Sequence, residues 1–164
     1  RLLHLSLWRT IEAPIIGTMT ARRNATPSSP LVLVVEDDPE TRQFYTEVLQ
    51  RDGFLVEQAH NGHQALHKAL EIDPDLILTD IAMPGIDGIE LCRRLRADSR
   101  THDIPVLAIS GYGDRQYADR ARLAGADRML AKPCDGGLIV DEARRLLLSR
   151  VGRALAPVED GGEP

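Results

Sequence analysis

DLILTD (residues 75–80) is a short apolar run that ends on an acid. An unbroken apolar run of this length, without polar alternation, favours a strand buried on both faces of a sheet. LVLVV (residues 31–35) has the same character, and it is followed by Glu36 and Asp37. The two runs therefore predict buried parallel strands with acidic side chains at their carboxyl ends.

Three further segments outside these runs have strand character: 54–59, 105–110 and 128–131. Apolar residues at helical spacing follow each predicted strand. The helices are predicted from Pro39 to just before Gly53, and over 63–72, 89–97, 114–124 and 135–150. Their predicted inward faces include Phe44, Leu70 and Leu138. Five strands alternating with five helices predict an α/β fold, a doubly wound parallel sheet covered on both faces.

Charge and composition exclude several classes of protein. The net charge of −5 argues against direct nucleic-acid binding, which needs clustered Lys and Arg. No apolar run approaches the roughly 20 residues of a membrane span. Cys92 and Cys134 form no C-x-x-C pair, so we expect reduced thiols in a cytoplasmic protein.

The chain is predicted to contain one domain, over residues 30–151. Residues 1–29 begin with Arg rather than Met, and we interpret them as a disordered leader, an expression remnant or a misplaced start. Residues 152–164 are expected to form a flexible tail. Whether the chain stands alone or is cut from a longer protein is left open.

The predicted strand ends carry a coherent set of side chains: Glu36, Asp37, Asp80, Ser110 and Lys132. In a doubly wound sheet, ligands bind beyond the carboxyl ends of the strands. Clustered carboxylates repel one another unless a cation lies between them, and oxygen ligands favour Mg²⁺. Asp80, at the end of a rigid strand, is the best-placed nucleophile for phosphorus, and Lys132 would supply a compact positive charge.

Four motifs carry a family resemblance: VVEDD (34–38), TDIAMPGIDG (79–88), PVLAISG (105–111) and AGADRMLAKP (124–133). With these motifs in this order, residues 31–150 resemble the receiver domain of bacterial response regulators, the CheY-like family. The resemblance implies a five-stranded parallel sheet of order 2-1-3-4-5 flanked by five helices, as in flavodoxin and CheY.

The resemblance also assigns roles in a Mg²⁺ site. Asp80 would be the phosphoacceptor, and Glu36 and Asp37 would bind the metal with Asp80 and the backbone carbonyl of Ala82. Ser110 would be the switch hydroxyl, and Lys132 would contact the phosphoryl group. The Lys132-Pro133 peptide is expected to be cis.

Two positions depart from the family. Met129 stands where an aromatic switch residue is common, so a ring flip cannot be the readout, although Met can repack. Cys134 stands where Phe is common. A second role for Ser110, as N-cap of the next helix, is left open.

The function implied is a signalling switch rather than an enzyme. A histidine kinase or histidine phosphotransfer protein would donate the phosphoryl group, which would hydrolyse slowly. An effector would bind the surface formed by residues 114–124, 128–131 and 135–150, and a homodimer is left open. Two alternatives remain: a pseudo-receiver that takes no phosphate, and an aspartate-nucleophile phosphatase, although Ala82 replaces the second acid that such enzymes use.

Two groups of polar residues are predicted to lie on the solvated surface. His60, His63 and His67 lack an H-E-x-x-H pattern and are predicted to be solvated rather than metal ligands. An arginine-rich stretch is likewise predicted to be a solvated face, with a partner contact as the weaker alternative; it comprises Arg93, Arg94, Arg96 and Arg100.

Overall fold

A computed structural model describes residues 29–111 and 115–155. The predicted leader, apart from Ser29, lies outside the described residues, as do residues 156–164 of the predicted tail. The last helix extends to Leu155, so the first residues of that predicted tail, 152–155, are helical. Among the described helices, none combines the length and the apolar character that crossing a membrane requires.

Strands and helices alternate along the chain, as predicted. The strands are β1 (Leu31–Val35), β2 (Leu55–Ala59), β3 (Leu76–Asp80), β4 (Val106–Ser110) and β5 (Arg128–Ala131). The helices are α1 (Pro39–Arg51), α2 (Gly62–Ile72), α3 (Gly88–Ala97), α4 (Arg115–Leu123) and α5 (Gly136–Leu155).

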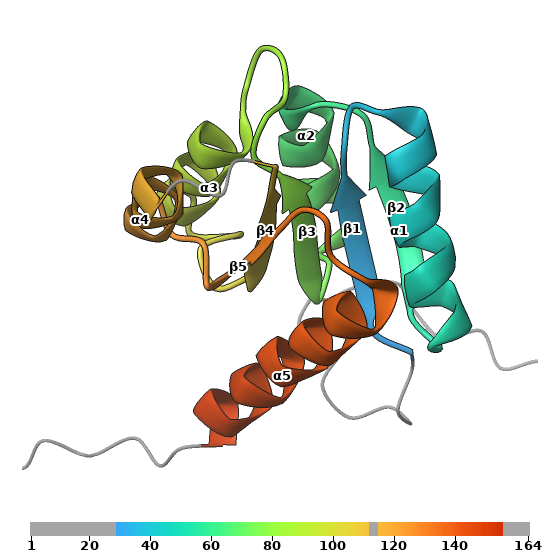
Figure 1. Cartoon of the computed structure of the whole chain (residues 1–164). Coiled ribbons are helices and arrows are strands. Elements are labelled where there is room, and N and C mark those ends of the chain that lie inside the picture. Colours follow the sequence, from blue (N-terminus) through green and yellow to red (C-terminus); the bar gives the residue numbers. More distant parts are fainter. Residues whose placement is uncertain (1–28, 112–114, 156–164) are drawn as a thin grey trace, which may run out of the picture.

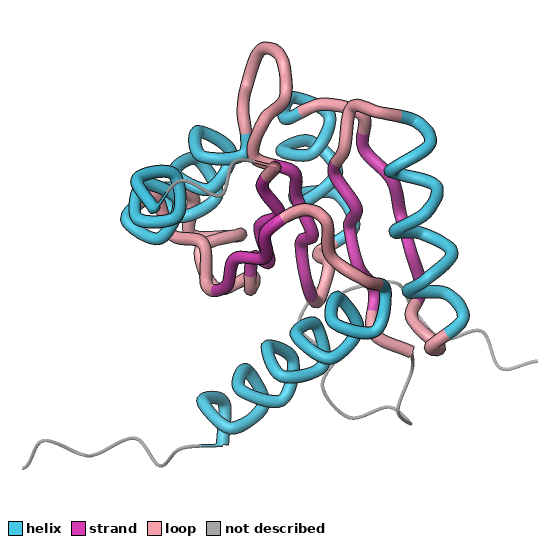
Figure 2. Tube along the Cα trace, in the orientation of Figure 1, coloured by secondary structure: helices cyan, strands magenta, loops and turns pink. Residues whose placement is uncertain are grey.

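The strands form one parallel sheet of order β2-β1-β3-β4-β5, which confirms the predicted order (Figure 1). All paired strands run in parallel, from β1 beside β2 to β4 beside β5. Their carboxyl ends therefore meet along one edge of the sheet, where loops lead into the helices (Figure 2).

Each face of the sheet has its own apolar core. Helices α1 and α5 cover one face, where Tyr45, Leu49 and Ile139 pack against alternate residues of β1, β3 and β4. Helices α2, α3 and α4 cover the other face, where Ala65, Leu95 and other buried residues pack against the intervening strand positions. Every residue of β3 is buried, as the unbroken apolar run predicted.

Capping residues set the starts of the helices. Asp38 is the N-cap of α1, and Pro39, where the helix was predicted to begin, is in its first turn. Asn61 is the N-cap of α2, and its side chain accepts a hydrogen bond from the backbone N–H of Gln64. The helix therefore starts at Gly62 rather than His63.

Three apolar side chains predicted to face inward are only partly buried. Phe44, Leu70 and Leu138 are 45%, 42% and 41% exposed. The predicted stripes were therefore too wide by one position.

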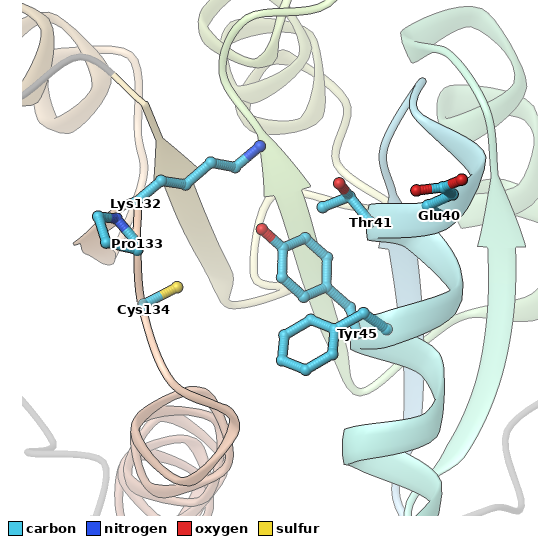
Figure 3. Close-up of a pocket in the computed structure, with 7 residues that line it drawn as sticks. Glu40, Thr41, Tyr45, Lys132, Pro133 and Cys134 are labelled. Carbon is cyan, nitrogen blue, oxygen red and sulfur yellow. The ribbon is translucent and has the colours of Figure 1, made fainter.

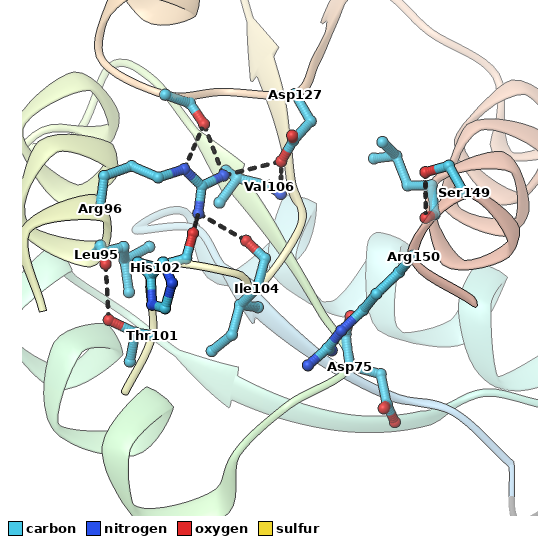
Figure 4. Close-up of polar contacts among 12 residues, drawn as sticks. Asp75, Leu95, Arg96, Thr101, His102, Ile104, Val106, Asp127, Ser149 and Arg150 are labelled. Atoms are coloured by element: carbon cyan, nitrogen blue, oxygen red, sulfur yellow. Dashed lines mark hydrogen bonds and ion pairs between the residues drawn. The ribbon is translucent and has the colours of Figure 1, made fainter. Parts of the chain in front are cut away.

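The arginine-rich stretch is solvated except at Arg96, where the prediction was wrong. Arg96 donates to the carbonyls of His102, Ile104 and Gly125 and to Asp127 Oδ2 (Figure 4). It thereby joins the end of α3 to the loops at the amino ends of β4 and β5. Its neighbours fit the prediction, with Arg93 and Arg94 paired to Glu90 on the surface.

Candidate functional site

The carboxyl edge of the sheet brings together the side chains that the sequence analysis selected. Glu36 directly follows β1, Asp80 ends β3, Ser110 ends β4, and Lys132 directly follows β5. Glu36, Asp80 and Ser110 are buried, Lys132 is half-buried, and Asp37 is exposed. The site thus combines two buried acids with one exposed acid at the carboxyl edge of the sheet.

Lys132 bridges the two buried acids. Its Nζ lies 3.1 Å from Glu36 Oε2 and 3.1 Å from Asp80 Oδ1. The backbone orients the remaining carboxylate oxygens, because Asp80 Oδ2 accepts from the N–H of Ala82 and Glu36 Oε1 accepts from the N–H of Asp38. The Lys132-Pro133 peptide that follows is cis, as expected.

Burial and neighbouring charges shift the pKa values of Glu36 and Lys132. Burial, helped by the charge of Asp80, raises the pKa of Glu36 above its ordinary value, although Lys132 opposes the shift. Burial alone would lower the pKa of Lys132, but its contacts with Asp80 and Glu36 outweigh that effect and raise it. Lys132 is therefore charged at neutral pH and partly compensates the two buried acids.

The acids fit a small divalent cation. One ligand atom from each of Glu36, Asp37 and Asp80 lies within 4.8 Å of the others. Because Mg²⁺ binds oxygen at about 2.0–2.1 Å, opposed ligands of one ion are about 4 Å apart. Asp80 Oδ1 is also buried without a hydrogen bond of good geometry, despite its ion pair with Lys132. This acidic cluster could therefore hold a metal.

The two predicted switch positions lie on adjacent strands. Ser110 is buried, and its strand pairs with β5 so that Ser110 aligns with Ala131 and Ala108 aligns with Met129. Met129 is partly buried and packs against the core on the α3–α4 face. The alternative N-cap role of Ser110 depends on residues 112–114, which lie outside the described residues, so it stays a prediction.

A cleft of about 400 Å³ opens beside Lys132. Its walls come from the first turns of α1 and from the loop after β5, and Figure 3 shows Lys132 reaching over the Tyr45 hydroxyl. The lining residues are Glu40, Thr41, Phe44, Tyr45, Lys132, Pro133 and Cys134. Burial raises the pKa of Tyr45 to about 12, so its hydroxyl stays protonated. This cleft thus adjoins Lys132 on the α1 side.

Two residues near the site had no role in the sequence analysis. Tyr45 packs in the core on the α1–α5 face, and it also lines this cleft. Arg42 was not singled out, yet its guanidinium binds the backbone carbonyls of Glu36 and Asp37. No sequence pattern links an arginine to carbonyls five and six residues earlier. The histidines behave as predicted: His63 and His67 are exposed, and His67 lies 3.6 Å from Glu71.

Comparison with known proteins gives consistent matches. A family model described as the response regulator receiver domain matches residues 32–144. The chain is 37% identical over 118 residues to the DNA-binding dual master transcriptional regulator RpaA of Synechocystis, covering 72% of this chain and 49% of RpaA. The chain thus spans about half the length of this relative.

Solved structures share the fold. The receiver domain of a signal transduction histidine kinase from Syntrophus aciditrophicus superposes with a TM-score of 0.69 at 29% identity, covering 82% of this chain and 98% of that chain. The chemotaxis protein CheY4 of Vibrio cholerae gives a TM-score of 0.69 at 29% identity, covering 72% and 98%. The shared region includes the sheet whose carboxyl edge carries Asp80 and Lys132.

Proposed function

Because the chain belongs to the response regulator receiver domain family of two-component signalling, we propose that Asp80 is its phosphoacceptor. One observation carries this proposal: Lys132 lies 3.1 Å from both Glu36 and Asp80, with Asp37 close by, at the carboxyl edge of the sheet. A buried nucleophile beside an acidic metal cluster and one fixed ammonium suits transfer of a charged phosphoryl group.

The proposed reaction moves a phosphoryl group from a donor histidine to Asp80. A carboxylate oxygen of Asp80 attacks phosphorus, the P–N bond breaks, and the imidazole leaves with its electron pair and gains a proton. Glu36, Asp37, Asp80 and the carbonyl of Ala82 would hold Mg²⁺, which supplies charge neutralisation for the phosphoryl oxygens. Lys132 contacts one phosphoryl oxygen, and Ser110 donates to another.

The proposed partners follow from the family. A histidine kinase or histidine phosphotransfer protein in the cytoplasm donates the phosphoryl group. An effector reads the surface formed by α4, β5 and α5, and water slowly removes the group. RpaA is a DNA-binding regulator by its name; for this chain, the charge of −5 supports action through a protein partner.

The test is labelling by a small phosphodonor. The parent protein with acetyl phosphate and Mg²⁺ should gain one phosphoryl group by intact mass, and Asp80→Asn should gain none while keeping its circular dichroism spectrum. A pseudo-receiver predicts no gain in the parent either. A phosphatase predicts rapid multiple turnover of the donor. Undiminished labelling of Asp80→Asn would place the acceptor elsewhere and end the proposal.

A further inference from the structure

Arg42, in the second turn of α1, binds the backbone of the acidic loop. Its Nη1 donates to the carbonyl of Glu36 at 2.7 Å and to the carbonyl of Asp37 at 3.2 Å. These carbonyls belong to the two residues whose side chains form the acidic cluster with Asp80. One guanidinium nitrogen therefore fixes the backbone positions from which both carboxylates project.

A second set of hydrogen bonds fixes Arg42 itself. Its Nε donates to Gln58 Oε1 at 3.3 Å, and Gln58 Nε2 donates to Thr46 Oγ1 at 2.9 Å. Thr46 Oγ1 in turn donates to the carbonyl of Arg42 at 2.9 Å. Thr46 is buried, and Arg42 and Gln58 are half-buried. The network ties the acidic loop to α1 and β2, so the guanidinium has little freedom to leave the loop.

The loop would otherwise be under strain from its own charges. Glu36 and Asp37 are adjacent, and Asp80 adds a third carboxylate within 4.8 Å. Mutual repulsion favours conformations that move these groups apart. Bonds to carbonyl oxygens oppose that movement without occupying any carboxylate oxygen, which leaves the carboxylates available as ligands.

We propose that Arg42 is a positioning residue that holds the loop after β1 in its cation-binding conformation, with Gln58 and Thr46 orienting its guanidinium. This inference rests on the function proposed above, since it names what organises the metal site of the phosphoacceptor. Arg42 acts through the backbone, so its loss weakens Mg²⁺ binding although it removes a nearby positive charge.

The sign of that effect separates positioning from simple electrostatics. Removing a cation near the site should tighten Mg²⁺ binding if Arg42 acted only through its charge. If Arg42 positions the loop, Arg42→Gln should instead weaken Mg²⁺ binding. Arg42→Lys should weaken it too, because a single ammonium cannot make the hydrogen bonds that Nη1 and Nε of the guanidinium make together. Metal affinity should fall by about tenfold in each variant, the lower range for groups that orient ligands.

The measurement is calorimetric titration of the full chain with MgCl₂, together with labelling by acetyl phosphate over a range of Mg²⁺ concentrations. The Mg²⁺ concentration for half-maximal labelling should rise with the dissociation constant. The labelling rate at saturating Mg²⁺ should stay within about twofold of the parent, because the cation restores the loop once it binds.

Arg96→Gln is the matched control, because Arg96 also binds backbone carbonyls but at the opposite end of the sheet. It should lower thermal stability and leave Mg²⁺ affinity unchanged. Gln58→Leu tests the network separately. As a single substitution it should weaken Mg²⁺ binding, but in the double variant with Arg42→Gln it should add little to the loss, because both substitutions act through the same guanidinium.

Unchanged or tighter Mg²⁺ binding in Arg42→Gln overturns the inference, as does a Gln58→Leu effect that adds in full to that of Arg42→Gln. If Arg42→Gln does not fold, Gln58→Leu and Arg42→Lys decide by the same measurement. Failure of the proposed function would look different, because the parent protein itself would then take no phosphoryl group on Asp80.

Discussion

Glu36 and Lys132 form a buried ion pair at the candidate site. The Glu36 carboxylate is 2% exposed and lies next to Asp80, and it remains in the core because Lys132 is 3.1 Å away. Removing one partner of such a buried pair is usually more destabilising than replacing both. The two buried acids therefore depend on Lys132 and are not expected to stabilise the fold by themselves.

The raised pKa of Glu36 gives a pH-dependent prediction. Burial and the charge of Asp80 raise the pKa of Glu36 in the folded state above 4.5, so the folded state keeps the proton to higher pH than the unfolded state. Stability without metal should therefore fall as pH rises from about 4.5 through the folded-state pKa, and then level off.

Glu36→Gln should remove that part of the slope. The measurement is urea unfolding without metal at several pH values between 4.5 and 7. Glu47→Gln, which changes an exposed acid on α1, is the control and should leave the parent's slope intact. Equal slopes in the parent and Glu36→Gln would show that the protonation of Glu36 does not differ between the folded and unfolded states.

At the scale of elements, Arg96 joins three segments that the sequence separates. Its guanidinium donates to the carbonyls of His102, Ile104 and Gly125 and to Asp127 Oδ2, which also accepts from the N–H of Val106. Gly125 has φ of +109°, and a Cβ there would lie 2.4 Å from Arg96 Cγ. Glycine at this position thus allows the positive φ of the turn after α4, and it leaves room for the side chain of Arg96 to pack against the backbone.

Truncating Arg96 should destabilise the fold without affecting the site. Arg96→Met removes the side-chain donor to three backbone carbonyls and the ion pair with Asp127, which should cost about 2–4 kcal/mol of unfolding free energy. Phosphorylation of Asp80 at 25 °C should not change, since the contacts of Arg96 lie at the amino ends of the strands, away from the site. Chemical denaturation and intact-mass labelling of the same sample check both statements, and a loss below about 0.5 kcal/mol would contradict the first.

The sequence predicted the strands, the helices and the side chains at the strand ends, but it missed the contacts that long side chains make with backbone carbonyls. Buried strands such as β3 show as apolar runs, and parallel order brings Lys132 to Glu36 across 96 positions because both follow strands. Arg96 and Arg42 were missed because a long side chain can reach any nearby carbonyl, and no periodicity marks which one. Phe44 was misplaced because helical periodicity gives the direction of an apolar stripe better than its width.

For the whole molecule, the two cysteines should report on global unfolding. Cys92 on α3 is fully buried, and burial raises the pKa of its thiol to about 12. Cys134, beside the site, is only half-buried. Since the thiolate is the reactive form, Cys92 should react only through unfolding.

Labelling with a thiol reagent at pH 8 should modify Cys134 first and Cys92 at least about a thousandfold more slowly, given ordinary domain stability. Mass spectrometry of peptides over time measures both rates, and low urea should accelerate Cys92 alone. Comparable rates in buffer would mean that the core on the α3 side opens without global unfolding.

In the proposed function, the signal crosses the molecule from Asp80 to the surface of α4, β5 and α5. A phosphoryl group adds roughly −1.5 to −2 charges and three acceptor oxygens. Lys132 and Mg²⁺ can each satisfy one oxygen, which leaves one for the hydroxyl of Ser110 on the neighbouring strand. Ser110 is aligned with Ala131 and lies two residues from Ala108, which is aligned with Met129, so inward movement of Ser110 would allow Met129 to repack.

One charge-assisted hydrogen bond is worth about 1.5–3 kcal/mol, which shifts a two-state equilibrium partially rather than completely. We therefore expect Ser110→Ala to be phosphorylated on Asp80 but to respond weakly at the surface. Amide NMR shifts with and without beryllofluoride, a phosphoryl mimic, should change across Arg115–Ala131 in the parent and much less in Ser110→Ala. Equal changes in both proteins would mean that the coupling runs through another contact, because the hydroxyl is the only group that this substitution removes.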